Sequence, residues 1–134
     1  MKKSFIFLVS LSFLINVTAQ IRLDVAGDAK IQGKLELIQA PGDSSIFIGP
    51  NAGINDDGTD NRNTFLGTNA GEFNTSGFNN IFIGNYAGRK NTTSSNNTYV
   101  GYLAGSESTT SLNNTYVGTF AGIRNTGSSN TFIG

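Results

Sequence analysis

The chain has 134 residues, with 17 glycines and no cysteine, histidine or tryptophan, and its nine basic and nine acidic side chains give a formal net charge of zero. The absence of cysteine excludes disulfides and sulfur-ligated zinc or iron sites, and the absence of histidine removes the commonest general base and metal ligand. The balanced charge gives no electrostatic reason to expect nucleic acid or an anionic membrane surface as a partner.

The first nineteen residues, 1–19, have the pattern of a secretory signal peptide. Lys2 and Lys3 precede an apolar run of eleven residues, 5–15, and small residues continue as far as Ala19, where we expect cleavage. The apolar run is too short to span a bilayer as a stable helix. We therefore predict an exported protein with no membrane span after signal removal, and the alternative is an uncleaved anchor.

Residues 20–43 have the pattern of an extended lead-in between the signal peptide and the rest of the chain. Apolar and polar residues alternate between Ile21 and Leu37, which predicts a long half-buried β segment with kinks at Gly27 and Gly33. A Pro-Gly turn ends the segment. Because one apolar stripe on an extended chain is not a core, this segment needs identical neighbours to be buried.

From residue 44 to the end of the sequence, one motif occurs five times and then begins a sixth time. The copies are SSIFIGPNAG (44–53), RNTFLGTNAG (62–71), NNIFIGNYAG (79–88), NNTYVGYLAG (96–105) and NNTYVGTFAG (113–122), followed by SNTFIG (129–134). An anchor glycine recurs every 16 to 18 residues, at Gly49, Gly67, Gly84, Gly101, Gly118 and Gly134. A period this short and regular predicts an all-β fold, a parallel β-roll or β-solenoid of about five to six 17-residue coils in residues 44–134, with the sixth repeat truncated.

Each repeat has a strand-like triplet before its anchor glycine, and both faces of this triplet are apolar. The middle residue is aromatic in every copy, at Phe47, Phe65, Phe82, Tyr99, Tyr116 and Phe132, and the last residue is aliphatic. Successive strand residues point to opposite sides, so one face fills the interior and the other must be covered from outside, for which a second copy of the chain is a natural partner. We expect about one aliphatic side chain per coil in the interior, together with the alanine of the following Ala-Gly pair.

Threonine recurs on the aliphatic side of the triplet, at Thr64, Thr98, Thr115 and Thr131, and alternates there with isoleucine. A flat threonine ladder is what an ice-binding solenoid would display. Because the threonines share a side with the aliphatic residues and are interrupted by isoleucine, we expect them to pack in the interior.

Glycine and asparagine mark two further repeat positions. The anchor glycines and the Ala-Gly pairs lie where the backbone must turn and where coils stack closely, so we predict corners there. Asparagine recurs two residues before each aromatic residue, with serine in the first copy, at Ser45, Asn63, Asn80, Asn97, Asn114 and Asn130. We predict that stacked coils align these side chains into a hydrogen-bonded ladder.

The one acidic cluster consists of Asp56, Asp57 and Asp60, in the longest spacer. Its oxygen ligands would suit calcium, but the spacing is neither that of an EF-hand nor that of calcium-binding β-rolls, so a solvated turn is the simpler interpretation. We predict no metal and no cofactor. The repeats also supply no recurrent acid with a partner across a cleft, so we predict no enzymatic activity.

Large apolar side chains also occur outside the triplets. They are Phe73, Phe78, Tyr86, Tyr102, Leu103, Phe120 and Ile123. One interpretation is an aromatic binding strip for sugars or for a partner surface. The other, which we favour, is corner packing and subunit contact, because Tyr86, Leu103 and Phe120 share the position before Ala-Gly.

The NTFIGxxAG and NTYVGxxAG repeats with NTTxxNN spacers resemble the head repeats of trimeric autotransporter adhesins, whose coils form a left-handed parallel β-roll. Together with the lead-in LDVAGDAKIQGKLEL, they are similar also to repeat regions of secreted, tail-fibre-like proteins of Bacteroidetes-type bacteria. The resemblance covers about residues 21–134. It implies a homotrimeric surface fibre or adhesin stalk, exported across the inner membrane of a Gram-negative bacterium.

We therefore expect a secreted or cell-surface structural fibre that acts by multivalent presentation, with a host-cell, matrix or carbohydrate surface as its ligand. The alternative is a monomeric β-solenoid that binds calcium, carbohydrate or ice. A carbohydrate-active enzyme on the same scaffold would require a cleft with facing carboxylates.

Overall fold

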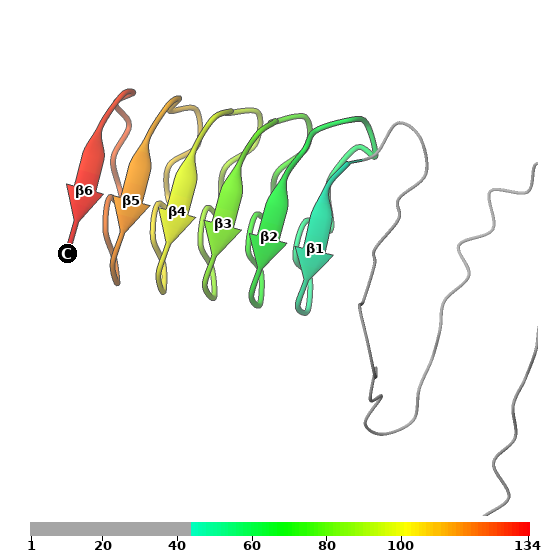
Figure 1. The fold of residues 1–134 in the computed structure, drawn as a ribbon, viewed down its shortest axis with the longest axis horizontal. Helices are drawn as coiled ribbons and strands as arrows, with labels where there is room; N and C mark the ends of the chain where they lie inside the picture. The colour runs from blue at the N-terminus through cyan, green and yellow to red at the C-terminus, as the bar shows by residue number, and fades with distance from the viewer. Residues whose placement is uncertain (1–43) are drawn as a thin grey trace, which may run out of the picture. The chain divides into compact units, whose positions relative to one another are not determined.

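The computed structural model describes residues 44–134, so the predicted signal peptide and lead-in lie outside the described residues. Six strands of three residues follow one another: β1 (Ile46–Ile48), β2 (Thr64–Leu66), β3 (Ile81–Ile83), β4 (Thr98–Val100), β5 (Thr115–Val117) and β6 (Thr131–Ile133). They form one parallel sheet in chain order (Figure 1), which confirms the predicted β-solenoid. In the part of the chain from residue 44 onward, the structure has no helix of sufficient length and apolar character to cross a bilayer.

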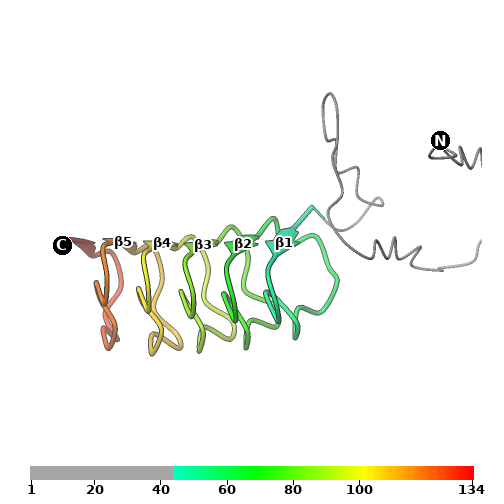
Figure 2. The ribbon, with the colours of Figure 1, turned by 90° about the horizontal axis from the view of Figure 1, so that it is seen from below.

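The strands pair in register, so that equivalent positions of successive repeats lie side by side. Phe47 pairs with Phe65, Phe82 pairs with Tyr99, and each of the other strands follows the same rule. We call each such line of equivalent residues along the solenoid a column. Viewed edge-on, the strands form one layer, and the connecting turns lie on one side of it (Figure 2).

The aromatic column of the triplets fills the interior of the solenoid. Its four central members are fully buried: Phe65, Phe82, Tyr99 and Tyr116. Neighbouring rings are stacked with centroids 4.6 to 5.1 Å apart. Parallel strands lie about 4.8 Å apart, which lets rings on successive coils stack in the offset manner that aromatic pairs prefer. Each inner ring therefore contacts the ring of the coil above and the ring of the coil below.

The expectation that the aliphatic and threonine side of the triplet packs inside is wrong. That side faces outward: Ile48 is 51% exposed, Leu66 43% and Val117 38%, and the threonines of the column are half-buried or exposed. The physical reason is steric: the aromatic rings fill the interior, and the glycine of each Ala-Gly pair leaves room for a ring. A Cβ on Gly88, for example, would lie 2.5 Å from the ring of Phe82.

The predicted asparagine ladder is confirmed, and it runs through the buried interior. The backbone amide of Asn114 donates to Oδ1 of Asn97 at 3.0 Å, and the same bond joins each asparagine to its neighbour along the column. In the first coil, Oγ of Ser45 accepts the amide of Asn63 at 3.1 Å. The side-chain amide of Asn80 also donates to a backbone carbonyl, that of Ser94, at 2.8 Å. The ladder thus links coils and spacers with side-chain oxygens as well as backbone carbonyls.

The anchor glycines form the predicted corner where coils approach most closely. Gly84 has a φ of +130°, and a Cβ there would overlap the carbonyl oxygen of Gly101 in the next coil. The other anchors from Gly49 to Gly118 have similar positive φ values and similarly close backbone neighbours. This column therefore accepts only glycine on steric and conformational grounds.

Candidate binding surface at one corner of the solenoid

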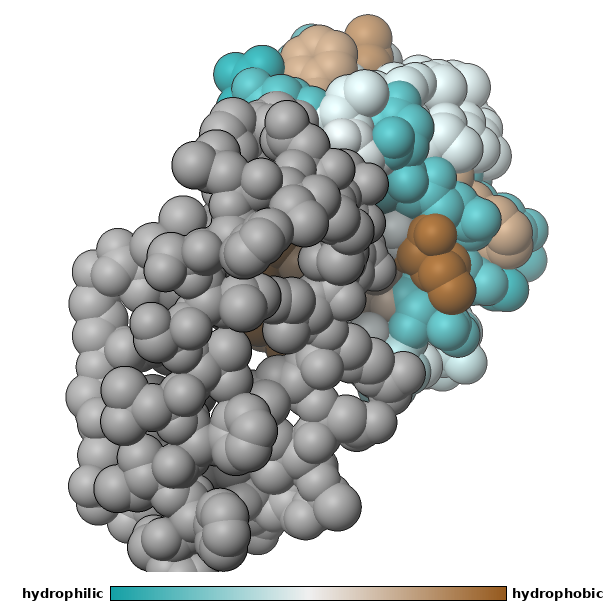
Figure 3. All heavy atoms as spheres, turned by 90° about the vertical axis from the view of Figure 1, so that its right-hand side faces the viewer, coloured by the Kyte–Doolittle hydropathy of each residue, from teal (hydrophilic) through white to brown (hydrophobic). Residues whose placement is uncertain are grey.

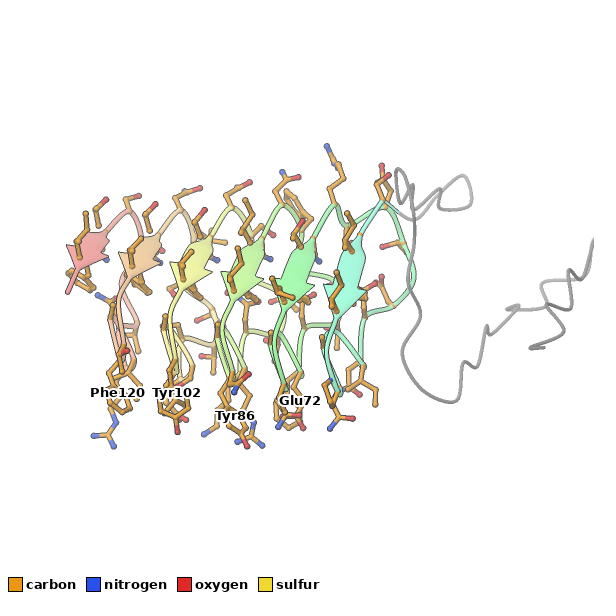
Figure 4. All side chains as sticks on the ribbon, turned by 60° about the horizontal axis from the view of Figure 1, so that its bottom comes forward. Glu72, Tyr86, Tyr102 and Phe120 are labelled. Atoms are coloured by element: carbon orange, nitrogen blue, oxygen red, sulfur yellow. The ribbon has the colours of Figure 1, made fainter. Side chains whose placement is uncertain are left out.

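Aromatic side chains from three successive coils lie along one corner of the solenoid, close to the Ala-Gly turns. Tyr86, Tyr102 and Phe120 follow one another along this edge (Figure 4). The ring of Tyr102 contacts both neighbours edge to face, with centroids 6.4 Å from Tyr86 and 5.5 Å from Phe120. Tyr102 is 47% exposed and Phe120 50% exposed. We call these three residues, together with Phe73 and Arg89, the aromatic ridge.

The backbone of this corner is left-handed in every coil. Tyr86, Leu103 and Phe120 have φ values of 62°, 57° and 62°. The equivalent residues of the first two coils, Asn51 and Asn69, have φ values of 57° and 56°. Asparagine tolerates this conformation well, whereas for bulky residues it is an outlier. The later coils therefore have large apolar side chains at a position where the backbone conformation favours asparagine.

Charged side chains of neighbouring coils pair along the ridge. Nε of Arg89 lies 2.6 Å from Oε2 of Glu72, and the guanidinium lies 5.4 Å from the ring centroid of Phe73 and 5.6 Å from that of Tyr86. The hydrogen bond to Glu72 raises the pKa of Arg89. Arg89 thus connects a carboxylate of one coil with two rings.

A second ion pair flanks the first. Nζ of Lys90 lies 2.6 Å from Oε2 of Glu107, again across neighbouring coils. Both pairs are part-exposed, so each contributes little to stability. The charges cancel within each of the two pairs, and the exposed Arg124, at the position of the next coil equivalent to Lys90 and Glu107, adds one positive charge to this surface.

A shallow groove of about 620 Å³ adjoins the ridge. It is lined by Asn55, Phe73, Thr75, Lys90, Thr92 and Thr109. The threonines belong to one column, and the hydroxyl of Thr75 donates to the carbonyl of Thr92 at 3.1 Å. Phe73 lines the groove and also contacts Arg89, so groove and ridge form one continuous surface.

The three aspartates of the longest spacer are not brought together as one site. Oδ1 of Asp57 accepts the amide and the hydroxyl of Thr59, which lowers the pKa of Asp57. Oδ2 of Asp56 accepts a hydrogen bond from the side-chain amide of Asn61 at 3.2 Å, and Oδ2 of Asp60 lies 3.9 Å from Nε of Arg62. Across residues 44–134, no group of three acidic, histidine or cysteine side chains could hold a metal ion. The carboxylates organise the loop internally.

The remaining large side chains are dispersed. Phe78 lies in another column, where its backbone amide donates to Oγ of Ser95, and its side chain is exposed. Separate apolar patches among hydrophilic residues are also visible in the view from the β1 end (Figure 3). The charged residues of the ridge were not singled out in the sequence. The available signal was the opposite charge at equivalent positions of neighbouring repeats, Glu72 with Arg89 and Lys90 with Glu107.

Comparisons with known proteins give no relative for this chain: no family model matches it, and neither a curated protein nor a solved structure does. The likeness to adhesin heads and tail-fibre-like repeats therefore rests on the repeat motif. The part of that likeness supported by the structure is the parallel β-solenoid with one coil per repeat. A role in a surface fibre is therefore a proposal.

Proposed function

We propose that this chain is an exported structural repeat protein that associates with copies of itself, three in the assembled fibre, and presents its spacers and corners in several copies. It has no catalytic role in this proposal. The observation that carries it is the outer face of the sheet. The export rests on the signal-like pattern of residues 1–19, and the number of copies rests on the motif resemblance.

The outer face combines two columns from all six strands. One column is aliphatic throughout, from Ile48 to Ile133, and the other consists of threonine and isoleucine. Parallel sheets occur almost only with both faces covered, and contiguous exposed apolar patches mark contact sites. Three copies around a common axis can each turn this face inward, and their columns match in length and spacing because the repeats are the same.

The size of this face determines how strong the contact can be. Five strand spacings of about 4.8 Å and a width of about 10 Å give an area of roughly 250 Å² per copy. Stable specific interfaces bury about 800 Å² per partner. Association through this face alone is therefore weak, and we expect the assembly of residues 20–134 to depend on protein concentration. Once assembled, several copies of each corner strengthen weak ligand contacts through effective concentration.

The test is the solution mass of residues 20–134, measured by light scattering over a wide range of concentrations, with and without a calcium chelator. We expect the mass to rise to three times that of the monomer and to be unchanged by the chelator. The variant Val100→Lys/Val117→Lys places charges on the outer face and should remain monomeric with an unchanged circular dichroism spectrum. The control Thr93→Lys/Thr110→Lys places the same charges on exposed spacers and should assemble normally. A wild-type protein that is monomeric at every concentration would refute the proposal.

One observation favours a second candidate function. The threonine column faces outward on a flat sheet instead of packing inside, and Thr98, Thr115 and Thr131 follow one another without interruption. A flat row of hydroxyls beside a row of methyl groups is the surface expected of an ice-binding solenoid. The same protein sample decides between the two: a folded monomer that shows thermal hysteresis, abolished in Thr98→Lys/Thr115→Lys, would support ice binding over self-association.

A further inference from the structure

We propose that the aromatic ridge and the adjoining groove bind a neutral polysaccharide chain that lies along the solenoid axis. The inference goes beyond self-association through the outer face, because the ridge lies at a different part of each coil and is complete within one copy. Its central residues are Tyr86, Tyr102 and Phe120, on three successive coils.

Packing at the corner does not account for the rings of Tyr86 and Phe120. A left-handed backbone is unfavourable for an ordinary side chain, and Tyr86 and Phe120 both have this conformation. An edge-to-face contact between two rings is stabilising. The two effects are of similar size and opposite sign. Asparagine, which occupies the same column at Asn51 and Asn69, would serve the fold without the cost.

The rings of Tyr102 and Phe120 are more exposed than corner packing requires. Rings selected for corner packing would be buried by their neighbours, as the interior aromatic column is. Tyr102 and Phe120 instead remain about half exposed. Because their mutual contacts are edge to face, part of the ring faces stays open to solvent. Phe120 therefore combines exposure with a left-handed backbone, a conformation that clusters at functional sites.

The chemistry of the ridge suits sugar rings. The open face of an aromatic ring is partially negative and attracts C–H groups of partial positive charge, such as those on one face of a sugar ring. Carboxylates and cations beside the rings supply acceptors and donors for sugar hydroxyls, from Glu72, Arg89 and Lys90. Since four of these charges are paired and only Arg124 adds to them, the surface suits a neutral ligand better than a strongly charged one. Apolar walls with a few placed polar groups are the usual composition of ligand sites.

The length of the ridge suits a ligand of several sugar rings. Coils are spaced by about 4.8 Å, so a surface that runs over four coils is roughly 15–20 Å long. This exceeds a single sugar ring and suits a chain of several. The groove continues the same direction, since its threonines Thr75, Thr92 and Thr109 lie on three successive coils. The ligand is therefore polymeric rather than a free monosaccharide.

The experiment is affinity electrophoresis of the full mature chain in native gels that contain laminarin, xyloglucan or galactomannan. We expect one of these neutral polysaccharides to retard the protein, and a gel with anionic polygalacturonate to give no retardation. Retardation by polygalacturonate alone, or by none of the four gels, would overturn the proposal. Competition with oligosaccharides cut from the retarding polymer should become stronger as their length increases.

Two ring variants test the site itself. Tyr102→Ala and Phe120→Asn should each weaken binding about threefold to tenfold, which is the contribution of one aromatic contact. Phe120→Asn restores the residue that the first two coils use, so its melting temperature should be equal to or above that of the wild type. The matched control is Phe78→Ala, which removes an exposed ring from another column and should bind normally.

The outcomes separate this inference from the proposed assembly. If Phe120→Asn lowers the melting temperature but leaves retardation unchanged, the ring is structural and the ligand site is refuted. The monomeric Val100→Lys/Val117→Lys variant keeps the whole ridge, so it should still be retarded, only more weakly because multivalency is lost. Failure of self-association therefore leaves the ligand site testable, and the converse also holds.

Discussion

Asn97 donates twice to the same atom of its neighbour in the preceding coil, Oδ1 of Asn80: from its backbone amide at 3.0 Å and from its side-chain amide at 3.2 Å. Its own Oδ1 accepts the backbone amide of Asn114 at 3.0 Å. All three residues are buried. The side-chain oxygen of each ladder residue therefore accepts a hydrogen bond from a backbone amide of the next coil, a role that backbone carbonyls usually fill in regular secondary structure.

Replacement of Asn97 by alanine should destabilise the solenoid by about 2–3 kcal/mol, because it leaves the buried amide of Asn114 without its acceptor. Replacement by serine should cost much less, since Ser45 performs the same role for Asn63 in the first coil. Urea unfolding followed by circular dichroism measures both variants. Equal losses of stability for alanine and serine would mean that the ladder bond does not carry the effect.

Gly84 and Gly58 provide a matched pair of glycines with positive φ. A Cβ on Gly84 would overlap a backbone oxygen of the next coil, whereas a Cβ on Gly58 would meet nothing within 4 Å. Gly58→Ala should cost about 1 kcal/mol, for the left-handed conformation alone. Gly84→Ala should cost about 3 kcal/mol because two coils must also move apart. A comparison of urea midpoints checks the ranking, and similar midpoints would contradict the close approach of the coils.

The regular part of the fold was predictable because the same local requirement recurs in each repeat. The triplets, the glycine corners and the asparagine ladder each appear five or six times, so a single ambiguous residue is resolved by its equivalents. The inward face was not predictable from the apolar pattern, since both faces of the triplet are apolar. The glycine of each Ala-Gly pair was a usable signal, because Gly88 is small where the ring of Phe82 lies over it.

The corner surface was only partly predictable for a different reason. Tyr86 and Phe120 were recognised as one repeat position, but their left-handed backbone was not. Asn51 and Asn69 at the same position were the signal, since asparagine often marks positive φ. The contacts of Arg89 with two rings depend on the spacing of coils in space, which the linear sequence does not contain.

The two buried tyrosines should be replaceable by phenylalanine with a gain in stability. The hydroxyl of Tyr116 is buried without a hydrogen-bond partner among the described residues, and that of Tyr99 lies among Ser108, Ser111 and Asn114 without a well-formed hydrogen bond to any of them. The same column has phenylalanine at Phe65 and Phe82, so the smaller ring fits. Each change should stabilise the fold by about 1 kcal/mol, the lower end of the cost of an unpartnered polar group. A loss of stability in Tyr99→Phe or Tyr116→Phe would show that an ordered water partners the hydroxyl.

The same tyrosines predict a loss of stability at alkaline pH. Burial raises the pKa of Tyr99, and burial together with the charge of Tyr99 raises the pKa of Tyr116 to about 12. An unfolded tyrosine ionises near pH 10. Between about pH 10 and pH 12 the unfolded chain therefore releases protons that the folded chain retains, so stability present below pH 10 is lost as the pH rises through this range.

The measurement is the urea midpoint of the wild type and of Tyr99→Phe/Tyr116→Phe at pH 8, 10, 11 and 12. The wild-type midpoint should fall steeply above about pH 10, and that of the double variant should fall much less. All other titratable groups are the same in both proteins, so the difference between the two curves isolates the tyrosines. Parallel curves would mean that water reaches the phenol groups and that the ring column is not a closed interior.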